Sequence, residues 1–321
     1  MVSHALRPLA LALVAVVGSG CSLQRVALEN LADTLAAPGD TFGADEDPEL
    51  VRDALPFSLK TMEALLAELP THGPLLLATG SGFAQYGYAF VQADAELVEA
   101  TDFERGQALR ERARKLYLRG RDYCLRNLEL RYPGLRTRLV TDPQGALAGT
   151  QRDDVPALYW TGAAWGLAVA NGLDKPELIA DLPSVRALFD RALLLDEAWN
   201  RGAIHAALVS LDASATMGGT PERARAHFAR AVELAAGADA GLYVSLAVSV
   251  AQPQQLRSEF ERLLQQALAL DLDRDPSRRL ANTLAQRRAR HLLARIDDLF
   301  LPDEPPADAV PPSGSQQGRS R

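Results

Sequence analysis

Residues 221–234 read PERARAHFARAVEL, and the positions of Ala224, Phe228 and Ala231 in this stretch decide the expected fold. A small residue, an aromatic four positions later and a second small residue three positions after that lie on one side of a helix. The small residues let a second helix approach, and the aromatic ring fills the remaining space. The same spacing recurs at Val185, Phe189 and Ala192 and at Leu256, Phe260 and Leu263. The chain is therefore predicted to contain repeated helix pairs.

This spacing is typical of the second helix of a tetratricopeptide (TPR) unit, whose period is about 34 residues. One such pair cannot bury its apolar face alone and stacks on neighbouring pairs. The helical pattern places TPR-like units at residues 75–132, 154–197, 199–236 and 241–271. We therefore predict an all-α fold, an array of degenerate TPR-like helix pairs (an α-solenoid) with extra N- and C-terminal helices.

The composition favours a helical protein and argues against one class of partner. Of the 321 residues, 47% are hydrophobic, so the chain can bury a large core, and only 6% are aromatic, which favours helix over sheet. The formal net charge is −7, and no basic patch is interleaved with aromatic residues. Nucleic acid is therefore not an expected partner.

The first residues resemble a bacterial export signal that ends at a lipoprotein cysteine. Arg7 supplies positive charge, residues 9–17 form a short apolar run, and the small residues Gly-Ser-Gly at 18–20 precede Cys21. The apolar run is too short to span a bilayer as a mature helix. Residues 1–20 are therefore interpreted as a lipoprotein signal peptide, with Cys21 as the residue that is lipidated.

The alternative is an ordinary cleaved signal in which Cys21 plays no part. It stays open because Gly18 stands three residues before the cysteine, where a lipobox usually has leucine. On the first interpretation, residues 21–46 are a lipid-attached N-terminal segment, residues 47–301 form the TPR-like helical domain, and the Pro/Ser/Gln/Gly-rich residues 302–321 are a disordered tail.

No motif in the sequence predicts catalysis or a metal site. The five histidines share no metal-ligand spacing, and neither a phosphate-binding loop nor a dinucleotide fingerprint is present. Cys21 and Cys124 are the only cysteines, so no disulfide framework can form, and Cys124 on a helical apolar stripe is expected to be a buried, inert thiol. We therefore expect a protein that is not an enzyme and that needs no cofactor or metal.

Aromatic residues on the first helices or at unit junctions are the best candidates for a ligand-binding pore or groove. Tyr and Trp carry a polar atom that a purely apolar core would have to satisfy. The candidate residues are Tyr86, Tyr88, Trp160, Trp165, Trp199 and His205. For each aromatic the alternative is inter-helix packing, and for His205 it is a core histidine bonded to backbone.

Several stretches together resemble one family. They are FVQADAELVEA, ARKLYLRGRDYCLRNLELRYPG, DDVPALYWTGAAWG, MGGTPERARAHFARAVEL and RLANTLAQRRARHLLARIDDLF. They look like the T component of TRAP transporters (the TatT family), which are periplasm-facing bacterial lipoproteins associated with tripartite ATP-independent transport systems. The resemblance covers most of residues 21–301.

The resemblance implies degenerate TPR-like pairs, a homotrimer, a pore or groove through each protomer, and association with the periplasmic solute-binding protein. The expected function is that of an accessory component which binds this protein, with relay of a hydrophobic or organic-acid ligand as a further role. A lipid anchor would place it on the periplasmic side of the envelope, at the outer membrane because Ser22 rather than Asp follows Cys21. The alternative is a structural TPR-like lipoprotein scaffold for envelope protein assembly.

Overall fold

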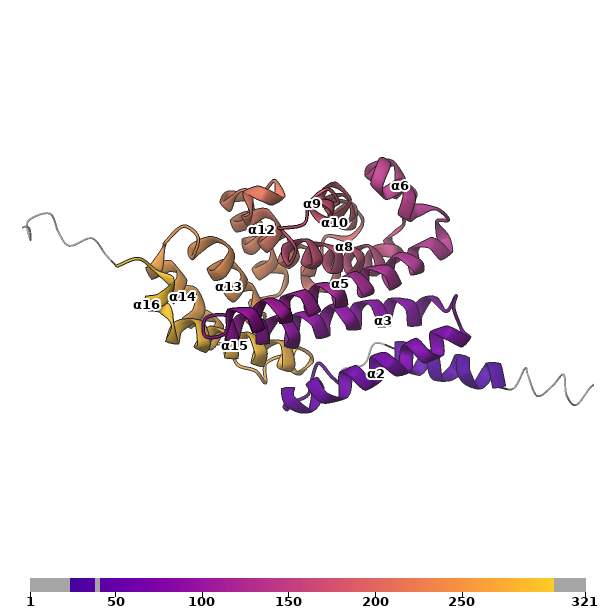
Figure 1. Ribbon diagram of the computed structural model, residues 1–321, viewed down its shortest axis with the longest axis horizontal. Helices are drawn as coiled ribbons and strands as arrows, with labels where there is room; N and C mark the ends of the chain where they lie inside the picture. The colour runs from indigo at the N-terminus through magenta and orange to yellow at the C-terminus, as the bar shows by residue number, and fades with distance from the viewer. Residues whose placement is uncertain (1–23, 38–40, 303–321) are drawn as a thin grey trace, which may run out of the picture.

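A computed structural model describes residues 24–37 and 41–302 of the chain (Figure 1). Within these ranges all regular structure is helical, which confirms the all-α prediction. The signal peptide, Cys21 and all but the first residue of the expected tail lie outside the described residues, so their assignments stay predictions.

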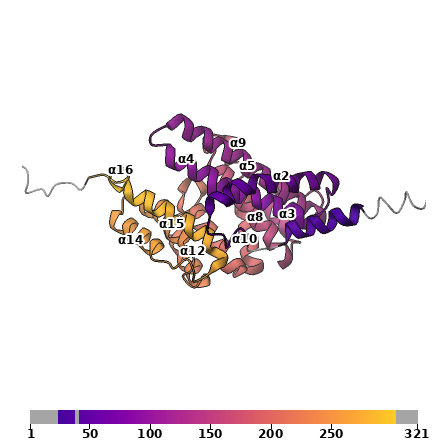
Figure 2. The ribbon, with the colours of Figure 1, turned by 90° about the horizontal axis from the view of Figure 1, so that it is seen from below.

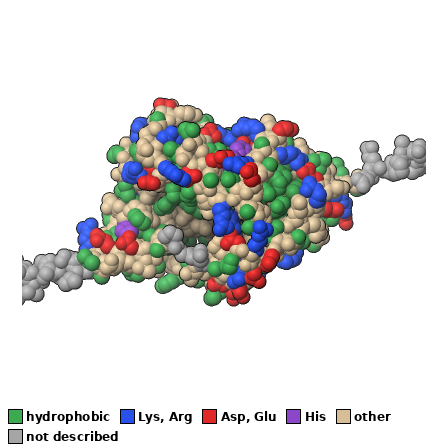
Figure 3. Space-filling view, turned by 180° about the vertical axis from the view of Figure 1, so that it is seen from behind, with side chains coloured by type: hydrophobic (Ala, Val, Ile, Leu, Met, Phe, Trp, Pro, Cys, Tyr) green, Lys and Arg blue, Asp and Glu red, His purple; other side chains and the backbone are tan. Residues whose placement is uncertain are grey.

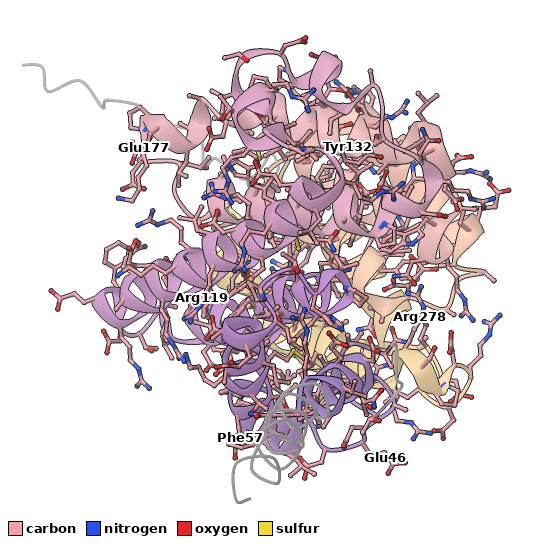
Figure 4. The ribbon with its side chains drawn as sticks, turned by 90° about the vertical axis from the view of Figure 1, so that its right-hand side faces the viewer. Glu46, Phe57, Arg119, Tyr132, Glu177 and Arg278 are labelled. Carbon is pink, nitrogen blue, oxygen red and sulfur yellow. The ribbon has the colours of Figure 1, made fainter. Side chains whose placement is uncertain are left out.

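Helix α2 (Pro48–Glu68) begins at a cap that the sequence encodes locally. The side chain of Asp47 accepts hydrogen bonds from the backbone N–H groups of Glu49 and Leu50, each at 3.0 Å. Because proline usually interrupts a helix, the sequence predicts two helices here, at residues 48–55 and 58–69. This prediction is wrong, since α2 runs through Pro56. Val51 and other apolar residues on both sides of Pro56 are buried in one stripe, and their packing offsets the lost backbone hydrogen bond. Phe57, by contrast, lies on the outer surface (Figure 4).

The next two stretches form a long helical hairpin. The first combines α3 (Gly73–Tyr86), a π-helical segment (Gly87–Gln92) and α4 (Ala93–Val98), and the second is α5 (Phe103–Arg131). Together these two stretches cover nearly all of the unit that the sequence places at residues 75–132. The side chain of Asp102 accepts a hydrogen bond from the Arg105 N–H at 3.0 Å and so starts α5.

Two glycines set the distance between α3 and α5. A Cβ atom added to Gly80 would lie 2.4 Å from Cys124 Sγ, and one added to Gly120 would lie 2.6 Å from the carbonyl oxygen of Gly80. Any side chain larger than hydrogen would therefore push the helices apart. Cys124 is fully buried at this crossing, and burial raises the pKa of its thiol, as expected for an inert cysteine.

The remaining helices follow one another along the body of the molecule (Figure 1). They are α6 (Leu135–Thr141), α7 (Pro143–Leu147), α8 (Val155–Ala170), α9 (Pro176–Ile179), α10 (Leu182–Asp196), α11 (Ala203–Ala213), α12 (Pro221–Leu234), α13 (Ala240–Leu246), α14 (Arg257–Leu268), α15 (Arg279–Ala294) and α16 (Ile296–Leu299). Helix α8 packs on α10, α11 on α12 and α13 on α14. These pairs fall within the expected units, while the TPR-like character of their stacking stays a prediction.

The repeated aromatic position is buried to different degrees in the three helices. Phe189 of α10 is 2% exposed and Phe260 of α14 is fully buried, whereas Phe228 of α12 is only partly buried. Phe260 contacts Phe300 with ring centroids 5.1 Å apart, so the C-terminal end of the described chain covers the last pair. The spacing thus identifies core positions, with Phe228 nearer the surface.

Helix α15 returns to the N-terminal helices, as the two ribbon views show (Figures 1 and 2). The backbone N–H of Leu280 donates to the carbonyl oxygen of Gly43 at 2.9 Å, and Arg287 forms an ion pair with Glu49 of α2. Helix α15 therefore contacts α2 and the loop that precedes α2.

Candidate functional site

Two of the candidate aromatics are core residues. Trp165 is 3% exposed, its indole N–H donates to Asp181 Oδ2 at 2.8 Å, and the guanidinium carbon of Arg121 lies 4.9 Å from its ring centroid. Tyr86 is 8% exposed and packs on Phe90 with ring centroids 5.8 Å apart. Both contacts suit the packing alternative, because the polar atom of Trp165 is satisfied inside the protein.

Two other candidates meet at a third aromatic that the sequence did not single out. The ring of Tyr159 lies 5.0 Å from that of Trp160 and 4.7 Å from that of Trp199. Trp160 and Trp199 are partly buried, and Phe189 closes the other side of Tyr159 at 6.1 Å. Tyr159 and Trp160 are neighbours in sequence and point about 100° apart around α8, yet their rings touch, and Trp199 joins them through its contact with Tyr159.

The hydroxyl of Tyr159 lies near charged groups. Burial raises the pKa of Tyr159, and the Asp239 carboxylate and Tyr88 raise it further. Asp239 is paired with Arg278, whose guanidinium Nη1 lies 2.6 Å from its Oδ2 (Arg278 is labelled in Figure 4). An aromatic cluster with a charged neighbour of this kind can hold a molecule that has both an apolar body and a polar end.

Tyr88 lies apart from the tryptophans along the chain but beside a second charged pair. It is 46% exposed, and Nη1 of Arg288 donates to its hydroxyl oxygen at 3.4 Å. The same guanidinium holds Glu96, with Nε 2.8 Å from Oε2. Burial acts to lower the pKa of Arg288, but Glu96 and Tyr88 together outweigh it, so that the pKa is raised and the arginine stays charged.

The π-helical segment Gly87–Gln92, which contains Tyr88, also carries a partly buried polar contact. Gln92 Oε1 accepts hydrogen bonds from the Tyr117 hydroxyl at 2.8 Å and from Asn171 Nδ2 at 2.9 Å. The Oδ1 atom of Asn171 is buried without a partner in the described part of the chain. Short π-helical segments within α-helices are frequent at functional sites. No sequence pattern predicted the segment Gly87–Gln92.

His205 of α11 is also buried, at 7% exposure, but its partners are side chains rather than backbone. Its Nδ1 lies 2.7 Å from Nδ1 of His227 on α12, and its Nε2 lies 3.1 Å from Glu197 Oε1. On the other side, His227 Nε2 lies 3.1 Å from Oδ2 of Asp212, which is fully buried. His205 also borders an open surface depression, whose other lining residues are Leu193, Leu194, Leu195, Asp196 and Glu197.

The six candidates therefore do not form one cluster of directly touching side chains. Trp160 and Trp199 meet at Tyr159, Tyr88 meets Arg288, and His205 meets His227. Figure 3 shows the face opposite to that of Figure 1, where hydrophobic and charged side chains are interspersed and the surface is hollowed near its middle. Whether the candidates line one continuous pore stays a prediction.

The described residues carry neither a metal site nor a membrane span. Nowhere in residues 24–37 and 41–302 do three His, Cys, Asp or Glu side chains gather in a way that could hold a metal ion. Across the same ranges, no helix has the length and apolar character needed to cross a bilayer.

The fold and these residues define an all-helical protein built from packed helix pairs, with aromatic and charged side chains gathered between them. The family model described as TRAP transporter T-component matches residues 44–300, which is well over half of the chain. An uncharacterized protein of Treponema pallidum (strain Nichols) is 32% identical over 303 residues, covering 88% of this chain and 94% of that protein. The chain belongs to the TRAP transporter T-component family, as the sequence resemblance indicated.

Proposed function

We propose that the protein is a periplasm-facing lipoprotein of a TRAP-type transport system that binds the periplasmic solute-binding protein and relays a hydrophobic or organic-acid ligand. The family match over residues 44–300 carries this proposal, because it covers nearly all of the helical domain. The role is one of binding rather than catalysis. The homotrimer is proposed on the family resemblance alone.

The cluster around Tyr159 supports the ligand part of the proposal. Trp160 and Trp199 are partly buried. Part of each ring is therefore accessible to a ligand from solvent, while the rest is packed against the protein. The ion pair of Arg278 with Asp239 lies near the Tyr159 hydroxyl and offers charge at one end of an apolar surface. A molecule with an apolar chain and a carboxylate matches this combination.

The position of the first helix supports a role close to a membrane. Residues 24–36 are helical, and residue 24 stands three positions after Cys21 in the sequence. Three peptide steps span at most about 10 Å. With Cys21 as the lipidated N-terminus after removal of residues 1–20, the helical domain would sit directly against the periplasmic surface of the proposed outer membrane.

Fluorescence of single-tryptophan variants tests the ligand site. In a chain that keeps only Trp160 or only Trp199, titration with medium-chain carboxylates should quench or shift the emission. A chain that keeps only Trp165 is the matched control and should not respond, because its indole is buried and bonded to Asp181. Equal responses of all three chains, or none, would contradict the proposed site.

Capture of partners tests the transport role. The chain from Ser22 onward, immobilised and mixed with a periplasmic extract, should retain a solute-binding protein of the TRAP type. Retention of envelope assembly proteins without any solute-binding protein would replace the proposal with its alternative, a structural TPR-like scaffold.

A further inference from the structure

Two histidines from neighbouring helices form a chain of contacts between two carboxylates. His205 Nδ1 and His227 Nδ1 lie 2.7 Å apart, which is hydrogen-bonding distance. The outer nitrogen of each ring faces a carboxylate oxygen at 3.1 Å, Glu197 for His205 and Asp212 for His227. The order Glu197, His205, His227, Asp212 therefore links the end of α10 to α11 and α12.

Counting protons along this chain fixes its charge. The His205–Glu197 hydrogen bond needs a hydrogen on His205 Nε2, and the central Nδ1–Nδ1 contact needs one hydrogen between the two rings. His227 Nε2 faces Asp212 Oδ2 at ion-pair distance, where the negative charge favours an N–H over a lone pair. All three contacts are therefore favourable together with three N–H groups. Two neutral rings carry two and two imidazolium rings carry four, so only one imidazole with one imidazolium satisfies every contact.

Either departure from this state breaks a contact. With two neutral rings, a nitrogen lone pair faces either a carboxylate oxygen or the other lone pair. With two imidazolium rings, two N–H groups point at each other across 2.7 Å. Because Asp212 is fully buried and His205 is 7% exposed, water cannot fully replace the lost partner.

The charged groups around the pair come from three helices and include as many arginines as carboxylates. Asp212 is also held by Arg186 of α10 and by Arg223 of α12, whose Nη2 lies 3.1 Å from Oδ2. Glu197 is held by Arg230 of α12 at 2.8 Å, and the Asp190 carboxylate of α10 lies near Asp212. Helices α8 and α13 also pack on α11, and neither residues 155–170 nor residues 240–246 contain a charged side chain.

We propose that His205 and His227 share a single proton and form a proton-linked contact that holds α12 on α11. The contact is strongest when the pair carries one positive charge, and it weakens both when a second proton is added and when the shared one is lost. Glu197 and His205 border the open depression after α10, so the proton exchanges with solvent from that side.

The titration behaviour of the neighbours agrees with this assignment. Burial lowers the pKa of His227, and the positive charge on His205 lowers it further, which is the repulsion expected of a second proton on the pair. Hydrogen bonds from Arg230 and His205 lower the pKa of Glu197 to about 2, so this carboxylate stays ionised wherever histidines titrate. The pH dependence therefore belongs to the imidazoles.

Nitrogen NMR of the full chain with ¹⁵N-labelled histidine rings tests the proton count directly. Near neutral pH, the two rings should show three protonated nitrogens and one unprotonated nitrogen, with exchange across the Nδ1 pair. Assignment uses His205→Gln and His227→Gln. Two neutral rings or two imidazolium rings at this pH would overturn the proposal, and this readout needs only the unmodified protein.

The melting temperature as a function of pH tests the consequence. Between about pH 5 and pH 9, which brackets the titration of imidazole, the unmodified protein should have a maximum. In His227→Gln the two-histidine contact is absent, so the rise of the melting temperature to this maximum should be smaller than in the unmodified protein. His291→Gln, which alters a histidine of α15 away from the pair, is the matched control and should keep it. Identical profiles for the unmodified protein and His227→Gln would overturn the proposal.

Discussion

Arg288 and Glu96 are 192 residues apart in the chain, yet Nε of the arginine lies 2.8 Å from Oε2 of the glutamate. The two side chains are 25% and 23% exposed, so the ion pair is largely withdrawn from water. It joins α15 to α4 beside Tyr88. The C-terminal helix is thus tied to the first helical hairpin by specific polar contacts.

Arg288→Met should destabilise the protein by about 1–3 kcal/mol, because Glu96 would lose its partner while mostly buried. Arg287→Met on the same helix is the control and should destabilise the protein by at most about 1 kcal/mol. In its ion pair with Glu49, the arginine side chain is 46% exposed and the glutamate side chain 67%. Urea unfolding measures both. Equal destabilisation by the two variants would show that the Arg288–Glu96 ion pair stabilises the protein no more than the exposed Arg287–Glu49 pair does.

Phe260→Ala should destabilise by about 3–5 kcal/mol, as for a fully buried phenylalanine. Phe228→Ala should destabilise the protein less than Phe260→Ala does, with a difference of roughly 1 kcal/mol or more between the two variants. The reason is that the Phe228 ring keeps part of its surface in water. Chemical unfolding of the two variants gives the comparison. The reverse order would contradict the burial that distinguishes these repeat positions.

Gly80→Ala should destabilise by about 1–3 kcal/mol even though alanine is the better helix former, because the new methyl group would overlap Cys124. Gly166→Ala in α8 is the matched control. Its methyl group would meet Val185 at an ordinary 3.4 Å, so it should be neutral or stabilising by up to about 1 kcal/mol. Thermal unfolding separates the two outcomes, and a stabilised Gly80→Ala would mean that α3 and α5 can move apart freely.

Glu99→Gln should destabilise at neutral pH and have little effect in acid. Hydrogen bonds from Arg110, including Nη2 to Oε2 at 2.5 Å, lower the pKa of Glu99 below its ordinary value. A carboxylate with a lowered pKa contributes stability above its unfolded pKa and loses it as the pH falls through the folded value. For this partly exposed pair the loss at pH 7 should be about 1 kcal/mol. The difference in melting temperature between the two proteins, measured from neutral to acid pH, checks the sign; a difference that grows in acid would refute it.

Mass spectrometry of membrane-extracted protein should find Cys21 as the mature N-terminus, diacylated on its sulfur. Cys21→Ser should release the protein from the membrane fraction, because one or more acyl chains provide the anchoring energy. Ser22→Ala keeps the cysteine and is the control that should stay membrane-bound. An N-terminus at another residue, or an unmodified Cys21, would return the interpretation to an ordinary cleaved signal.

The sequence by itself determined the helices and much of their order. Caps such as Asp47 and Asp102 act on backbone groups within three residues, so they can be read without knowing the fold. The spacing around Phe189 and Phe260 marked buried helix faces because every helix places such residues on one side. Pro56 is the exception: its local signal predicted a break, and packing of the apolar stripe on both sides of it prevailed.

Only the tertiary structure decided which side chains meet. His205 and His227 are 22 residues apart, and Tyr159 and Trp199 are 40 residues apart in α8 and the turn before α11. Their contact depends on how each helix is rotated about its axis and on how closely it approaches its neighbour. Those two quantities follow from the packing of the whole array, to which every pair contributes, and no local pattern of residues fixes them.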